Sequence, residues 1–269
     1  MSDTVAAARR NSAAHWTAYF IEAWALGMFM VSAGVFTMLL ESPVSPLHAA
    51  IPDAFLRRLL TGAAMGLTAI ALIYSPWGRR SGAHMNPAVT LSFLRLGTIA
   101  RNDAACYIVA QFIGGTLGVF GMLAVFGQAF SEPPVSYVAT VPGSAGVGAA
   151  FMAEMGISAL MIFVVLMVSS RMQLAPFTGL AAGLLVCLFI SFEGPLSGMS
   201  INPARSFASA LLGGIWTAFW IYLTAPVIGM QLGTAAFLAV RRPQSAPCAK
   251  LHHTSDERCI HCGYEPTQV

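Results

Sequence analysis

Six long apolar stretches alternate with short polar ones along the chain. They cover residues 16–40, 58–77, 104–126, 148–169, 174–193 and 215–240. A helix needs about 20 predominantly apolar residues to cross the hydrocarbon core of a bilayer. The pattern therefore predicts an all-α membrane protein with six transmembrane helices.

Two shorter segments, about residues 86–96 and 202–212, follow the second and the fifth stretch. At about 1.5 Å per residue, each is too short to cross a bilayer as a helix. Each opens with Asn-Pro-Ala, and asparagine is a favoured N-cap while proline suits the first helical turn. The sequence predicts two half-helices, which begin at Asn86, Pro87 and Ala88 and at Asn202, Pro203 and Ala204.

Composition supports the membrane assignment. Of 269 residues, 57% are apolar and 9% are charged, whereas a soluble domain has about 25% charged residues. A soluble globular protein is excluded. The net charge of +3 is too small to indicate a nucleic-acid partner.

The two halves of the chain repeat each other. Each half has a glutamate in its first stretch, Glu22 or Glu154, and an Asn-Pro-Ala segment after its second. The third stretch of each half contains a glycine pair at a spacing of four residues, such as Gly114 and Gly118 in the first half. Such pairs allow helices to approach closely. Three spans per half is an odd number, so repeat 2 (about 148–240) must lie inverted relative to repeat 1 (about 16–126). Inverted repeats with broken helices are typical of transport proteins.

The basic residues predict the orientation. With both termini inside, every Lys and Arg except Arg57, Arg58 and Arg205 lies on the inner side, as the positive-inside rule requires. We expect a multi-pass protein of the cell membrane, inner or plasma. Its N-terminal segment (1–15) and its tail (241–269) would then be cytoplasmic.

The inverted half-helices would meet near the membrane centre with their N-termini facing each other. Each N-terminus carries about half a positive charge, and the amides of Asn86 and Asn202 can donate hydrogen bonds to a passing oxygen. Arg205 adds a fixed positive charge on the outer side. Such an arrangement excludes cations and protons while uncharged molecules pass.

At these motifs the chain resembles the major intrinsic protein family, the aquaporins and glycerol facilitators, as an aquaporin-like channel of bacterial type. The resemblance is carried by Ser81–Thr90 and Ser200–Ser206, with Glu22, Glu154 and Ala110–Phe112, and covers about residues 16–240. It implies a homotetramer with one pore per protomer and no required cofactor. It also implies that Glu22 and Glu154 are structural acceptors for the re-entrant loops. Backbone carbonyls would line the pore at Gly82, Ala83, His84, Met85, Gly198, Met199, Ser200 and Ile201.

Alignment to the family motifs places the selectivity filter at Met65, Ile190, Met199 and Arg205. A typical water filter has Phe, His, a small residue and Arg, so here only the arginine matches. Two methionines make the ring more apolar and adaptable. We expect a passive channel for water and small uncharged solutes. The alternative is a dedicated facilitator of a neutral solute such as glycerol or urea.

Two other functional classes fit less well. In a proton-coupled secondary transporter, Glu22 and Glu154 would be coupling carboxylates, but both occupy equivalent positions in the two repeats, which favours a structural role. An enzyme lacks support because the apolar part carries no nucleophile–base pair and no catalytic residue.

The tail contains Cys248-x3-His252-His253-x5-Cys259-x-His261-Cys262. Cysteine and histidine are zinc ligands, and a Cys-x2-Cys pair is common in zinc sites. The sequence offers two interpretations of this tail. One is a structural zinc site with the ligands Cys248, His252, Cys259 and Cys262. The other is an unstructured segment with reactive cysteines.

Overall fold

The computed structural model describes residues 2–241, 248–253 and 259–264. Within them, six helical segments are long and apolar enough to span a membrane: His15–Glu41, Ala54–Tyr74, Arg101–Phe126, Gly146–Ser169, Ala175–Ser197 and Trp220–Val240. The predicted six spans and the all-α fold class are confirmed. The spans belong to α1 (Ser2–Glu41), α3 (Ala54–Tyr74), α6 (Arg101–Phe126), α8 (Gly146–Ser169), α9 (Thr178–Leu188) with its extension, and α12 (Trp220–Val240).

Several boundaries differ from the sequence expectation. Helix α1 begins at Ser2, so the helix continues through the segment 1–15 that we expected to precede the first span. Helix α3 begins earlier than predicted because the Asp53 carboxylate caps it, accepting the Leu56 N–H at 2.7 Å. It ends at Tyr74, ahead of Ser75 and Pro76, since the residue before a proline avoids the helical conformation.

The fifth span is not a uniform α-helix. After α9 it widens into one π-helical turn, η3 (Phe189–Glu193), and finishes as α10 (Gly194–Ser197). Such turns are rare and concentrate at functional sites. This turn carries Ile190, one of the four predicted filter residues.

The long helices pack in pairs: α1 with α6, α8 with α12, and α3 with α9. Glycine makes the contacts possible. A Cβ atom on Gly114 of α6 would lie 1.9 Å from the Ala23 carbonyl oxygen, and one on Gly229 of α12 would lie 2.2 Å from that of Met155. These contacts occupy equivalent places in the two repeats.

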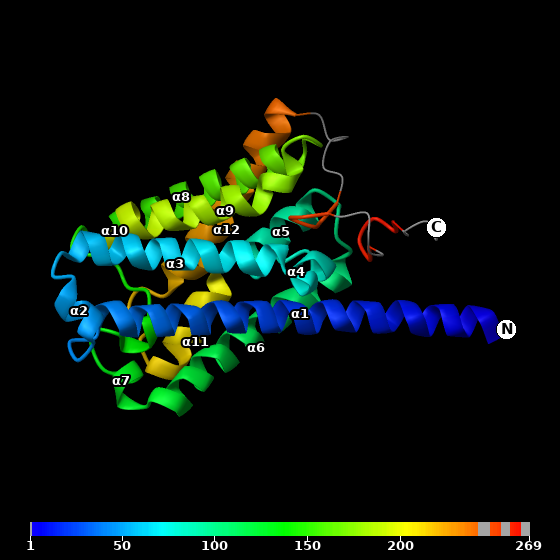
Figure 1. Cartoon of the computed structure of the whole chain (residues 1–269). Coiled ribbons are helices and arrows are strands. Elements are labelled where there is room, and N and C mark those ends of the chain that lie inside the picture. The colour runs from blue at the N-terminus through cyan, green and yellow to red at the C-terminus, as the bar shows by residue number, and fades with distance from the viewer. Residues whose placement is uncertain (1, 242–247, 254–258, 265–269) are drawn as a thin grey trace.

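The two half-helices are α5 (Pro87–Arg95) and α11 (Pro203–Gly213), and both begin at the predicted proline. Figure 1 shows that α5 lies toward the end of the bundle at which α1 begins, while α11 lies toward the opposite end. The second half-helix is therefore inverted relative to the first, as the repeat predicts.

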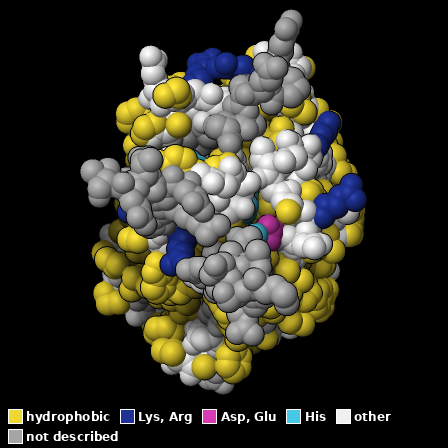
Figure 2. Space-filling model, turned by 90° about the vertical axis from the view of Figure 1, so that its right-hand side faces the viewer, with side chains coloured by type: hydrophobic (Ala, Val, Ile, Leu, Met, Phe, Trp, Pro, Cys, Tyr) yellow, Lys and Arg dark blue, Asp and Glu magenta, His cyan; other side chains and the backbone are white. Residues whose placement is uncertain are grey.

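Short elements join the spans. They are α2 (Pro46–Ala50), α4 (Pro76–Ser81), α7 (Gln128–Ser131) and the 3-10 turns η1 (Ser136–Val138) and η2 (Ala175–Phe177). Helix α4 leads into the first re-entrant loop, and α10 leads into the second. Figure 2 looks onto the end of the bundle at which α1 begins, where Lys and Arg side chains lie among hydrophobic ones.

Candidate functional site

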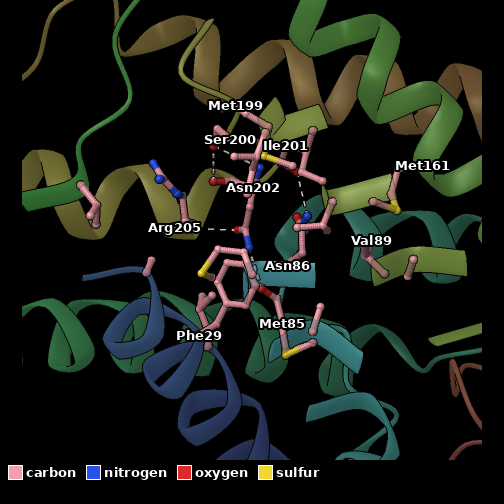
Figure 3. Close-up of a pocket in the computed structure, with 18 of the residues that line it drawn as sticks. Phe29, Met85, Asn86, Val89, Met161, Met199, Ser200, Ile201, Asn202 and Arg205 are labelled. Carbon is pink, nitrogen blue, oxygen red and sulfur yellow. Dashed lines mark hydrogen bonds between the residues drawn. The ribbon is translucent and has the colours of Figure 1, made fainter. Parts of the chain in front are cut away.

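A cavity of about 300 Å³ lies where the two half-helices meet (Figure 3). Its lining is predominantly apolar. The polar residues lining it include His84, Asn86, Asn202 and Arg205. We call its end beside His84 the inner mouth and its end beside Arg205 and Val138 the outer mouth.

Asn86 and Asn202 face each other across the centre. Each side-chain oxygen caps its own half-helix: Asn86 Oδ1 accepts from Ala88 N at 2.9 Å, and Asn202 Oδ1 accepts from Ala204 N at 3.1 Å. Because each oxygen is held by its own half-helix, the Nδ2 atom of each asparagine points away from that helix. Because an amide nitrogen carries two hydrogens and each Nδ2 makes one protein hydrogen bond among the described residues, one N–H of each remains for an oxygen in the cavity.

Glu22 is fully buried and holds the first re-entrant loop. Its carboxylate accepts from Ser81 Oγ at 2.8 Å, from the backbone N–H groups of His84 at 3.0 Å and Met85 at 2.7 Å, and from Gln111 Nε2 at 2.9 Å. Buried carboxylates in a membrane protein require such partners. Neither oxygen is left to face the cavity.

Glu154 repeats this arrangement in the second half. It accepts from Ser197 Oγ at 2.8 Å and from the backbone N–H groups of Ser200 and Ile201 at 2.6 and 2.7 Å. A tyrosine hydroxyl supports each loop as well: Tyr107 donates to Ser81 O, and Tyr222 donates to Ser197 O. This role of the two tyrosines was not predicted from the sequence.

The loops need these anchors because their backbone is strained. Ala83 and Met85 in the first loop have φ of 54° and 51°, and Met199 and Ile201 in the second have 51° and 48°. Residues with a Cβ atom rarely adopt positive φ, and each such residue costs on the order of 1–3 kcal/mol. The buried glutamates offset this cost by fixing the loop N–H groups.

All four residues that we expected in the selectivity filter line the cavity: Met65, Ile190, Met199 and Arg205. Arg205 lies on the first turn of α11, and its Nη1 atom is buried without a hydrogen-bond partner among the described residues. An unpartnered guanidinium N–H is a donor for a hydroxyl or carbonyl oxygen in the cavity. The other three side chains present only apolar surface or a thioether.

Seven of the eight residues whose carbonyls we expected to line the pore border the cavity. Ala83, His84, Met85, Gly198, Met199, Ser200 and Ile201 border the cavity, whereas Gly82 does not. The Gly82 carbonyl accepts the Leu251 N–H at 3.2 Å instead. The tail takes this position, which the sequence pattern could not reveal.

Val89, which lies in the first family motif, contributes apolar surface to the lining (Figure 3). Phe29 and Met161 also contribute apolar surface, but they carried no sequence signal. The loop between α6 and α8 covers the outer mouth with Pro134, Val135, Val138 and Ala139. Nothing in a single sequence distinguishes these from ordinary core residues.

The tail brings together a different ligand set from the one that we predicted. Ligand atoms of Cys248, His253, Cys259 and Cys262 all lie within 4.8 Å of one another. His252 is not among them, because its ring packs edge-on against Tyr74 with the centroids 4.9 Å apart. The sequence prediction of His252 as a ligand is therefore wrong for this arrangement: the adjacent His253 takes its place.

Burial lowers the pKa of the nearby His261 imidazole to about 4, so its ring is neutral at pH 7. Its Nε2 lies 3.2 Å from Ser81 O and 3.2 Å from Tyr107 Oη. The tail therefore reaches the same loop that Glu22 anchors.

Comparison with known proteins gives consistent results. The family model described as "Major intrinsic protein" matches residues 9–237. Aquaporin NIP6-1 of Arabidopsis thaliana is 35% identical over 189 residues, which are 70% of this chain and 60% of that protein. Aquaporin NIP2-2 of Zea mays is 36% identical over 186 residues, 69% of this chain and 60% of that protein.

The match thus spans 60% of the length of these two relatives. Among solved structures, the aquaglyceroporin from Plasmodium falciparum has a TM-score of 0.69 with 19% identity, covering 86% of this chain and 98% of that chain.

Proposed function

This chain belongs to the major intrinsic protein family, and on that premise we propose that it is a passive membrane channel for water and small uncharged solutes. The observation that carries the proposal is the pair of outward-facing Asn86 and Asn202 amides at the facing ends of α5 and α11. A water that accepts from both amides must point its own hydrogens away from the centre, which interrupts a proton wire. The half-helix dipoles and Arg205 oppose cations in the same place.

The carboxylates argue against coupled transport and against catalysis. Glu22 and Glu154 are saturated with loop hydrogen bonds, and neither lines the cavity. A coupling carboxylate has to exchange its proton with solvent or substrate during the cycle. A channel also accounts for the residues of the site without any catalytic role.

The apolar filter supports a second candidate, a dedicated facilitator of a neutral solute. Met65, Ile190 and Met199 offer an apolar surface to the carbon skeleton of a solute. Among the described lining residues, Arg205 is the charged donor for a solute oxygen. A polyol or urea has both kinds of surface. The second candidate differs from the first only in the ratio of solute flux to water flux.

Stopped-flow light scattering on proteoliposomes tests both candidates. We expect fast, non-saturating flux that a proton gradient does not change. Measuring water, glycerol, urea and ammonia in one preparation ranks the solutes. Saturation together with gradient dependence would overturn the channel in favour of a transporter.

We further propose that the channel is a homotetramer in the cell membrane with both termini cytoplasmic. The family resemblance supports the tetramer, and the distribution of basic residues supports the orientation. Native mass spectrometry of the detergent-solubilised protein measures the first. A reporter fused to the C-terminus, active only in the cytoplasm, measures the second.

A further inference from the structure

Two described segments of the tail, 248–253 and 259–264, lie against the inner mouth. Ala249 and Leu251 are almost completely buried, with 0% and 6% of their surface exposed. The Ala249 carbonyl oxygen lies 2.5 Å from His84 Nε2, and the Leu251 N–H donates to Gly82 O at 3.2 Å. The tail therefore bonds directly to the re-entrant loop that precedes α5.

Among the described residues of the tail, Leu251 reaches the cavity. It lines the cavity together with His84, Val89 and Met161. Leucine offers a permeating water no hydrogen bond, and apolar constrictions close channels by excluding water. The position of Leu251 is thus that of a plug in the inner mouth.

The two ends of this plug are potential metal ligands. Cys248 comes directly before Ala249, and His253 follows two residues after Leu251. The second tail segment adds Cys259 and Cys262 from a tight turn, in which the Gly263 N–H donates to Cys259 O at 3.1 Å and Gly263 has φ of 72°. Glycine adopts that conformation without strain.

The ligand atoms have the spread of a zinc site. Cys248 Sγ lies 3.3 Å from Cys259 Sγ, and His253 Nε2 lies 3.3 Å from Cys262 Sγ. Zinc lies about 2.3 Å from sulfur and about 2.0 Å from nitrogen in tetrahedral sites, so its ligands stand about 3.5–4 Å apart. Cys248 and Cys259 are buried while His253 and Cys262 are exposed, which leaves a path for the ion to enter.

We propose that Zn²⁺ bound by Cys248, His253, Cys259 and Cys262 fixes the tail in the inner mouth, where Leu251 reduces the flux through the channel severalfold. A segment this short has too small a core to hold a fold without a staple, and metal binding supplies that free energy. Loss of the ion frees the tail and opens the mouth. This inference rests on the proposed channel function.

The adjacent histidines provide a matched pair for the first measurement. Zinc content of the purified full chain should be about one ion per protomer, unchanged in His252→Ala and lost in His253→Ala and in Cys259→Ser/Cys262→Ser. Equal zinc in all variants would overturn the site. A disulfide between Cys248 and Cys259, found by mass spectrometry in the purified protein, would overturn it as well.

Water flux in proteoliposomes tests the plug. We expect a strong chelator to raise the flux of the wild type and of His252→Ala severalfold, and added Zn²⁺ to restore it. His253→Ala should conduct at the high level under both conditions. Leu251→Ala should conduct faster than the wild type while it retains zinc. This result would distinguish the effect of the Leu251 side chain on flux from the effect of zinc binding.

The failures can be told apart. Zinc bound at full occupancy with a flux that neither the chelator nor Leu251→Ala changes would overturn the plug and leave the channel intact. Absence of flux from all variants, including those without zinc, would overturn the channel itself.

Discussion

The side-chain amide of Asn86 donates to the backbone carbonyl of Ile201 at 2.7 Å, across the junction of the two half-helices. The inverted partner of this bond runs from Asn202 to Met85, also at 2.7 Å. Each re-entrant loop is thus held by its own glutamate and by the asparagine of the opposite repeat. The two halves of the site cannot separate without breaking both bonds.

Asn86→Asp should reduce both stability and water flux. A carboxylate has no hydrogen to donate, so Ile201 O loses its partner and faces a negative charge. An unsatisfied buried polar group costs about 1–3 kcal/mol. Thermal unfolding in detergent and proteoliposome shrinkage would measure the two effects, and Asn202→Asp should behave in the same way. Wild-type flux and stability in both variants would show that the cross-loop bonds do not hold the site.

Glu154→Gln should lower the free energy of unfolding by about 1–3 kcal/mol, because an amide NH₂ replaces one acceptor of the loop N–H groups. Glu193→Gln is a matched control on the same side of the membrane. The Glu193 carboxylate is buried, yet neither of its oxygens accepts from a loop N–H group in the described parts of the chain. We expect the control to unfold at the wild-type temperature or above. If both variants lost the same free energy of unfolding, burial of the carboxylate rather than its bonds to the loop would determine the loss of stability.

Much of the fold follows from local patterns. Apolar length predicted the six spans, and the Asn-Pro-Ala pairs predicted both half-helix starts, because an N-cap followed by proline acts within a few residues. The π-helical turn at Ile190 and the seat of the tail in the inner mouth escaped prediction. The seat of the tail depends on contacts between residues distant in the sequence, such as Leu251 with Gly82.

The candidate site, like the fold, could be predicted only in part. Alignment to the family motifs selected the four residues that we expected in the filter, and all four line the cavity. His252 and His253 could not be distinguished from sequence, because only the packing of His252 on Tyr74 decides which of the two neighbours turns toward the thiols.

Gly114→Ala should prevent correct assembly of the bundle. The added Cβ would lie 1.9 Å from the Ala23 carbonyl oxygen on α1, whose backbone cannot yield without moving the helix. Gly121→Ala on the same helix meets nothing within 4 Å, so it controls for the change in residue type. Size-exclusion chromatography of the solubilised protein should show aggregation or loss for the first variant and a normal peak for the second. A normal peak for both would mean that α1 and α6 are free to separate.

Arg205→Val should increase the leak of cations and the passage of larger neutral solutes relative to water. The substitution removes the fixed positive charge of the outer mouth and the buried Nη1 donor, and it replaces a long side chain by a short one. Each 1.4 kcal/mol removed from a barrier raises the rate by about tenfold, so even partial loss of the electrostatic barrier is measurable as ion flux.

Arg205→Lys keeps the charge but not the planar donor array. It should therefore retain cation exclusion while it changes the ratio of glycerol to water flux. Arg95→Val, at the far end of α5 where Arg95 is exposed and bonds to Gln231 O, should leave selectivity unchanged. Unaltered selectivity in Arg205→Val would place the constriction elsewhere in the cavity.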